Sequence, residues 1–219
     1  MGVMGIWQAN ATMLALLIVV NMALSIAGGA LWIAVGTLSL LVALFLSFRQ
    51  GMRLGHDACG VSSTIEGARR AGEQVYAQLD ARYLRQAWSR RTGFRGLMAS
   101  ALIPYAASCV YIIMTLVGGE AGALSLPTVI ARSIAWVLSI HCWPLILHWH
   151  ADFVTLTPAI AVMLLASPFL LPALTYLGYL QGPRLWAQTE AAMKAGRRRA
   201  KARARVGKSL APKRQKPEI

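Results

Sequence analysis

Charge is missing from the beginning of this 219-residue chain: residues 1–48 contain no Asp, Glu, Lys or Arg. Soluble domains carry about 25% charged residues, so the absence argues against a soluble amino-terminal domain. A signal peptide would begin with basic residues, and none is present. Two membrane spans of about 20 residues each fit the same length. We therefore expect residues 1–48 to form a transmembrane helical hairpin that stays in the membrane.

Acidic residues and cysteines are also scarce. The chain contains eight Asp and Glu residues and 22 Lys and Arg residues, which gives a formal net charge of +14. It contains only three cysteines. The odd number and long spacings of Cys59, Cys109 and Cys142 favour buried free thiols over a disulfide framework. No paired carboxylates, Ser-His-Asp arrangement, glycine-rich phosphate loop or zinc-protease motif occurs. We expect a protein that is not an enzyme and that needs no cofactor.

Hydrophobic residues dominate what remains. They make up 57% of the chain, and the mean hydropathy is +0.53. The sequence therefore predicts an all-α, polytopic membrane helix bundle. The apolar stretches that could enter a bilayer are 6–27, 30–48, 97–117, 128–147 and 153–180.

The basic residues indicate how often the chain crosses. Nine Arg lie in residues 49–95 and twelve Lys or Arg in residues 184–219, and positive charge collects on the cytoplasmic side. The stretch 97–117 is one crossing, so both segments share one side only if the chain crosses an odd number of times between Pro127 and Gln181. We expect four crossings plus a re-entrant or interfacial segment around Pro144, because proline breaks helical hydrogen bonds. Five crossings, with either the tail or the nine-Arg loop outside, are the alternatives.

This topology divides the chain into four parts. They are a transmembrane hairpin (1–48), a cytoplasmic segment (49–95), membrane helices (96–181) and a basic cytoplasmic tail (182–219).

The cytoplasmic segment carries the pattern of an amphipathic helix. Apolar or small residues recur at steps of four and three from Val61 to Leu79, and Ser63 with Glu66 fits a capping box. We expect one helix over residues 62–91 that lies on the bilayer or docks to a cytoplasmic protein.

The tail is predicted to begin a second helix at Gly182-Pro183, since proline suits a first helical turn. Leu185, Trp186 and Met193 give it an apolar side, and a basic helix of this kind lies among anionic headgroups. RNA, including ribosomal RNA, is another candidate ligand, and a purely topological role is the third. The cations expected to bind a membrane surface or polyanion are Arg197, Arg198, Arg199, Lys201, Arg203 and Arg205.

Polar residues at membrane depth are costly and need a reason. Arg132 lies five residues after Pro127, so it could snorkel to the surface or pair with Glu120, or it could bind a substrate. The possible polar membrane site consists of Arg132, Glu120 and His141. Five residues are of types that bind metal ions: His56, Cys59, His148, His150 and Asp152. Their spacing matches no metal-binding motif, so we expect no metal site.

Two functions fit these features. The first is a non-catalytic membrane component that binds a protein partner or anionic lipid through its cytoplasmic helix and basic tail. The second is a small transporter or channel subunit with a path near Arg132 and the proline-rich last segments. No motif of a named family is present; only the general layout is similar to that of insertase-type proteins of the Oxa superfamily. The oligomeric state stays open.

Overall fold

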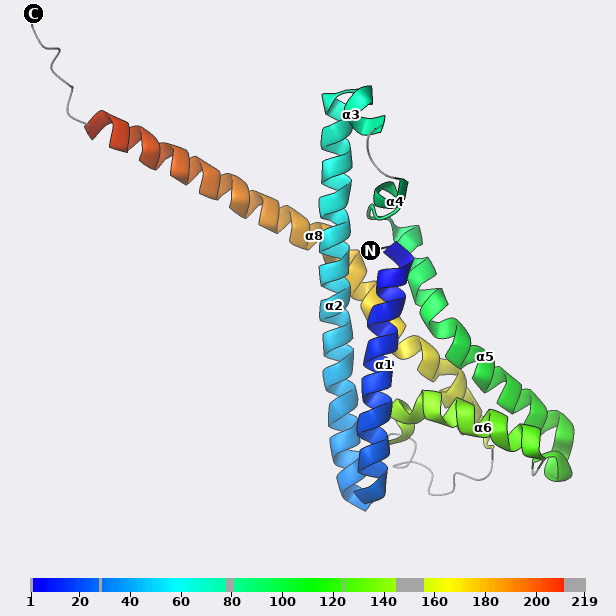
Figure 1. The fold of residues 1–219 in the computed structure, drawn as a ribbon. Helices are drawn as coiled ribbons and strands as arrows, with labels where there is room; N and C mark the ends of the chain where they lie inside the picture. The colour runs from blue at the N-terminus through cyan, green and yellow to red at the C-terminus, as the bar shows by residue number, and fades with distance from the viewer. Residues whose placement is uncertain (1, 28, 78–80, 124, 145–155, 211–219) are drawn as a thin grey trace, which may run out of the picture.

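The computed structural model describes residues 2–27, 29–77, 81–123, 125–144 and 156–210, and within these ranges it is helical, without a strand (Figure 1). Four helices are long: α1 (Gly2–Ala27), α2 (Gly29–Ala71), α5 (Arg90–Ala123) and α8 (Pro158–Leu210). The short elements are α3 (Glu73–Ala77), α4 (Ala81–Leu84), α6 (Leu126–Ser139) and the 3₁₀ helix η1 (Ile140–Cys142).

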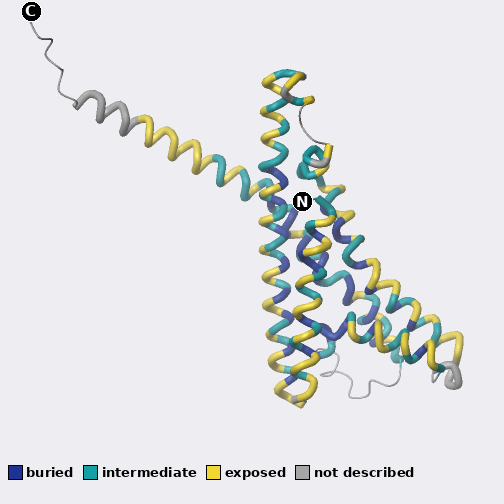
Figure 2. Tube along the Cα trace, viewed as in Figure 1, coloured by how far each residue is buried: buried dark blue, intermediate teal, exposed yellow. Residues whose placement is uncertain are grey.

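The four long helices are each long and apolar enough to cross a membrane, whereas the apolar helix Leu126–Cys142 is shorter. Their outward faces carry large apolar side chains, such as Ile26 at 89% and Val117 at 83% exposure. Figure 2 shows exposed residues along the outer sides of the helices and buried residues between them. Lipid is the environment in which such faces are stable. For the described residues, the prediction of an all-α fold with several helices that could cross a membrane is confirmed.

The helices run up and down around a small core (Figure 1). α1 and α2 form the predicted hairpin, and Gly29 at the turn has φ +58°, which glycine adopts without strain. α6 lies across the bundle at the end where α1 meets α2, and the start of α5 lies toward the opposite end. Residues 145–155 lie outside the described chain, and the re-entrant or interfacial placement of the Pro144 segment stays a prediction.

The expected separate helix over residues 62–91 is wrong. α2 continues past Phe48 to Ala71, and Ser63 Oγ donates to the carbonyl of Gly60 at 3.0 Å instead of capping a helix. A helix that has begun extends easily, and no proline interrupts residues 49–71. The break falls at Gly72, where φ is +128°, and only the short α3 and α4 follow before α5.

The expected helix start at Gly182-Pro183 is also wrong, because α8 runs through Pro183 without a break. A proline inside a helix leaves the carbonyl four residues earlier without its usual donor. Here that carbonyl belongs to Tyr179, and the indole Nε1–H of Trp88 donates to it at 3.4 Å. A side chain from another part of the chain thus replaces the missing hydrogen bond. The apolar part of α8 and the basic tail therefore form one continuous helix.

Candidate functional site

Four glycines bring α2 and α8 into backbone contact. Gly51 and Gly55 on α2 lie against α8, and Gly178 and Gly182 on α8 lie against α2. A Cβ at any of these positions would overlap backbone of the other helix. Small residues four apart are the pattern that lets membrane helices approach closely. The crossing therefore fixes the direction in which α8 leaves the bundle.

Aromatic side chains secure the crossing on its far side. The Trp186 ring meets the His56 ring edge-on, with centroids 5.1 Å apart, and covers Gly60. The Trp88 ring stacks on Tyr179 at 6.2 Å, and the backbone N–H of Trp88 donates to Ser62 Oγ at 2.9 Å. The loop before α5 is thereby attached to both long helices at one place.

Beyond Trp186, residues 187–210 of α8 form the basic arm, which leaves the bundle sideways from α2 (Figure 1). Every side chain from Ala191 to Lys201 is exposed (Figure 2). Glu190 precedes this stretch and pairs with Lys194 at 2.6 Å. The side chains of Arg203 and Arg205 lie outside the described part, although their backbone is helical. The exposed cations of the arm are Lys194, Arg197, Arg198, Arg199 and Lys201.

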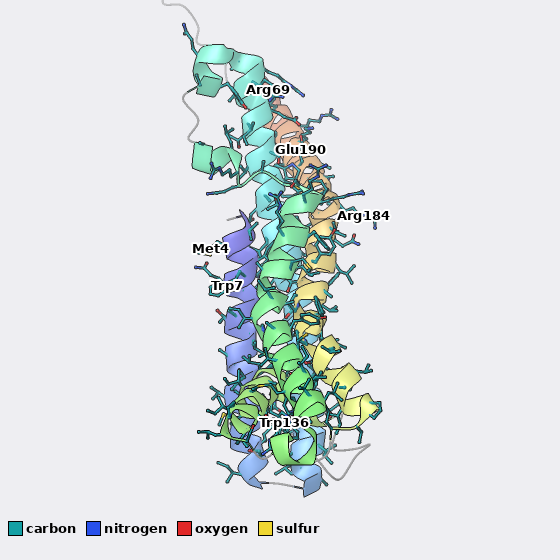
Figure 3. The ribbon with its side chains drawn as sticks, turned by 90° about the vertical axis from the view of Figure 1, so that its right-hand side faces the viewer. Met4, Trp7, Arg69, Trp136, Arg184 and Glu190 are labelled. Atoms are coloured by element: carbon teal, nitrogen blue, oxygen red, sulfur yellow. The ribbon has the colours of Figure 1, made fainter. Side chains whose placement is uncertain are left out.

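Two grooves open at the same end of the bundle. One, of about 760 Å³, lies between the first residues of α1 and the segment around Arg85 and Arg95. The other, here called the α5–α8 groove, has about 540 Å³ and contains Arg90 and Arg184. In Figure 3, Arg184, Arg69 and Glu190 all lie toward one end of the molecule, and Trp136 lies toward the other. We call the arginine-bearing end the basic end.

A buried polar cluster connects three of the long apolar helices. Asn10 of α1 is 4% exposed; its Nδ2 donates to Ser100 Oγ of α5 at 3.1 Å. Thr175 Oγ1 of α8 donates to Asn10 Oδ1 at 2.7 Å. Hydrogen bonds between side chains of this kind hold membrane helices in register.

A cavity of about 140 Å³ lies beside this cluster, between α1, α5, α8 and the end of α6. His141 lines it, is 1% exposed, and its Nε2 lies 3.4 Å from the carbonyl of Ser167. A carbonyl only accepts, so this contact requires the proton on Nε2. Asn10 and Ser100 add polar atoms to a mostly apolar wall. The space suffices for a few waters or a molecule of the size of benzene.

The three residues of the possible polar membrane site are placed differently. His141 lines the central cavity, whereas Arg132 lines another hollow of about 330 Å³ beside Trp32, Trp136 and Trp143. The Trp136 and Trp143 rings meet at 4.3 Å, and Figure 3 places Trp136 at the end opposite the arginines. Tryptophans and a cation typify a membrane interface. The side chain of Glu120 lies outside the described part, so its pairing with Arg132 stays a prediction.

Among the described residues, no three His, Cys, Asp or Glu side chains lie close enough to hold a metal ion. His148, His150 and Asp152 fall outside those residues. His56 instead contacts its neighbour Asp57 at 3.3 Å as well as Trp186. Cys59 and Cys142 are buried free thiols, and Cys109 is a half-buried one.

The sequence reasoning missed the helix crossing and the Asn10 cluster. The signal for the crossing was present, because residues 51–55 and 178–182 each read Gly-x-x-x-Gly. Asn10 was visible as an amide within the first span, but nothing local identifies its partners at Ser100 and Thr175. Comparisons of the chain with known protein families, curated proteins and solved structures found no match.

Proposed function

We propose that this protein is a non-catalytic, multi-pass membrane component whose basic arm binds the anionic surface of its own membrane. One observation supports this most directly: the arm is a continuous helix, exposed from Ala191 to Lys201, that carries cations and packs on no other described element beyond its base. Most helical stability in proteins comes from packing. An anionic surface would supply the missing partner.

The geometry of the arm favours a membrane surface over other polyanions. The arm leaves the bundle sideways, so it extends over neighbouring lipid and not straight away from the bundle along the direction of α2 (Figure 1). Lys194, Arg197 and Lys201 are spaced by three and four residues, which puts them on one face of the helix. Each cation near an anionic leaflet contributes about 1 kcal/mol. The glycine crossing holds the arm in position, so little orientational freedom is lost on binding.

The proposal places the basic end, both termini and the segment 49–95 in the cytoplasm, following the distribution of positive charge. A reporter that is active on only one side of the membrane tests this when it is fused after Ile219 or inserted after Gly72. Equal activity of the two fusions, with the signal of the cytoplasmic side, is expected. Signals from opposite sides would contradict the four-crossing topology and the role of the arm.

The arm itself is tested with an environment-sensitive fluorophore on Ala195→Cys, in full-length protein whose three native cysteines are replaced by alanine. In nanodiscs with phosphatidylglycerol the fluorescence should shift to the blue, and 1 M salt should reverse the shift because the Debye length falls to about 3 Å. Replacement of all three residues Arg197, Arg198 and Arg199 by Gln should abolish it. The matched control replaces Arg49 and Arg53, which lie on α2.

Three outcomes would contradict the lipid assignment. The first is an identical signal in nanodiscs that contain only phosphatidylcholine. The second is that added RNA removes the arm from phosphatidylglycerol at low concentration, which would indicate RNA as the ligand. The third is that the full-length protein captures a cytoplasmic protein and that this capture requires the same three arginines, which would indicate a protein partner.

A transport function is the second candidate, and the cavity beside His141 is the observation that favours it. A buried imidazole among Asn10, Ser100 and Ser167 could pass a proton or hold a small polar solute. Proteoliposomes that enclose a pH-sensitive dye test the proton case. If the protein transports protons, the wild type should give a proton flux that His141→Leu abolishes. A proton flux equal to that of empty liposomes in both the wild type and the variant would contradict the transport function. The Arg132→Ala variant in the same assay shows whether the hollow beside Arg132 also contributes to the flux.

A further inference from the structure

The α5–α8 groove combines cationic and apolar walls. It lies where the first turn of α5 meets α8, at the point where the apolar stretch of each helix gives way to arginines. Its position, at the edge of the apolar part of the bundle, is the depth at which phospholipid headgroups lie. The residues that matter for its chemistry are Trp88, Arg90, Tyr176, Leu180, Gln181 and Arg184.

The cationic wall suits a phosphate group. Arg90 is the first residue of α5, and the free N–H groups and dipole of this helix N-terminus also favour an anion. Arg184 Nη1 donates to Gln181 Oε1 at 3.3 Å, which leaves the remaining guanidinium N–H groups and the Gln181 amide as donors. None of the described residues that line the groove is Asp or Glu. Two guanidinium groups with no competing carboxylate form a donor set for phosphate oxygens.

The apolar wall suits an acyl chain. Tyr176 and Leu180 are one turn apart on α8, and Phe94 of α5 meets the Tyr176 ring edge-on with centroids 6.2 Å apart. Phe94 is 52% exposed and lies three residues before the apolar stretch 97–117 of α5. A chain that follows this wall away from the arginines stays against apolar surface. A free phosphate ion would leave that wall unused.

The groove exists before any ligand binds. Ser89 Oγ accepts a hydrogen bond from the Thr92 N–H at 3.0 Å, and the Ser89 N–H donates to Tyr179 Oη at 3.4 Å, so the start of α5 is fixed on α8. Gly93 allows the close approach, since a Cβ there would lie 2.7 Å from the Tyr179 ring. A preformed site loses less affinity to ordering than one that forms on binding.

We propose that the α5–α8 groove binds one anionic phospholipid, with its phosphate between Arg90 and Arg184 and one acyl chain along Tyr176 and Phe94. The groove is separate from the basic arm. The basic end would lie at a headgroup layer whether it faces the cytoplasm or the opposite side of the membrane. The inference therefore does not rest on the proposed function.

Native mass spectrometry of the full-length protein in detergent, titrated with phosphatidylglycerol or phosphatidylcholine, tests the inference. Wild-type protein should bind one phosphatidylglycerol more tightly than phosphatidylcholine. The double variant Arg90→Gln, Arg184→Gln should bind it about tenfold more weakly, because two charge-assisted contacts are lost. The matched control, Arg49→Gln with Arg53→Gln on α2, removes two cations that do not line the groove and should bind like wild type.

Several results would overturn the inference. The double variant could bind like wild type, the two lipids could bind equally, or the control variant of Arg49 and Arg53 could lose the same affinity. Glycerophosphoglycerol, the headgroup without chains, could compete as strongly as the lipid, which would show that the site takes a phosphate and no acyl chain. The unfolding temperature of each variant without added lipid reports whether it is folded. If the double variant is unfolded, the single Arg184→Gln variant carries the same test.

Discussion

The glycine crossing of α2 and α8 makes a sharp prediction about stability. In Gly55→Ala, the added methyl group would overlap the Tyr179 carbonyl and would lie 3.0 Å from Gly182 Cα. These are backbone atoms that cannot rotate away, so the two helices must separate. Overpacking in a closely packed interior costs about 1–3 kcal/mol, and the rigid partners put this substitution at about 3 kcal/mol. For a protein of this size that corresponds to a fall in Tm of about 6–12 °C.

Gly67→Ala is the matched control on the same helix. No atom lies within 4 Å of a Cβ at Gly67, so the methyl group meets open space. Alanine also favours the helix over glycine by about 0.8–1.0 kcal/mol. The same chemical change should therefore lower stability at one position and leave it equal or slightly higher at the other, twelve residues further along α2.

Thermal unfolding in detergent, followed by a thiol-reactive dye, measures both variants. Cys59 and Cys142 are buried and become reactive as the bundle opens. A Gly55→Ala variant within 0.5 kcal/mol of wild type, a limit well below the overpacking range, would refute the close crossing. So would an equal loss in Gly67→Ala, because that would point to a general intolerance of alanine in α2.

Two further substitutions test contacts between distant parts of the chain. Asn10→Leu removes the hydrogen bonds to Ser100 and Thr175. Each such bond between membrane helices contributes about 0.6 kcal/mol, with a maximum near 1.7, so we expect a loss of roughly 1–2 kcal/mol in the same unfolding assay. Unchanged stability would contradict the contact between the three helices. Trp88→Phe keeps an aromatic ring but leaves the Tyr179 carbonyl without its donor, so we expect a loss of about 1 kcal/mol in the same assay. Unchanged stability would contradict the replacement of the missing helical hydrogen bond by Trp88.

The sequence alone predicted a membrane protein and determined the approximate positions of the long apolar helices, because hydropathy is a local property and a bilayer imposes a length of about 20 residues. All four long helices contain stretches that were predicted in this way. It also determined that 21 of the 22 basic residues lie in two segments, since this follows from counting alone.

Only the tertiary structure decided where the helices end and what meets at the basic end. Gly182-Pro183 reads locally as a helix start, yet α8 continues because Trp88, 91 residues from Tyr179, supplies a hydrogen bond that the proline removed. The Gly-x-x-x-Gly spacings name residues that can touch a helix but not which helix they touch. Hydropathy acts through each residue's own transfer to lipid, whereas a crossing, a polar cluster or a groove depends on pairs of distant residues, which no local pattern specifies.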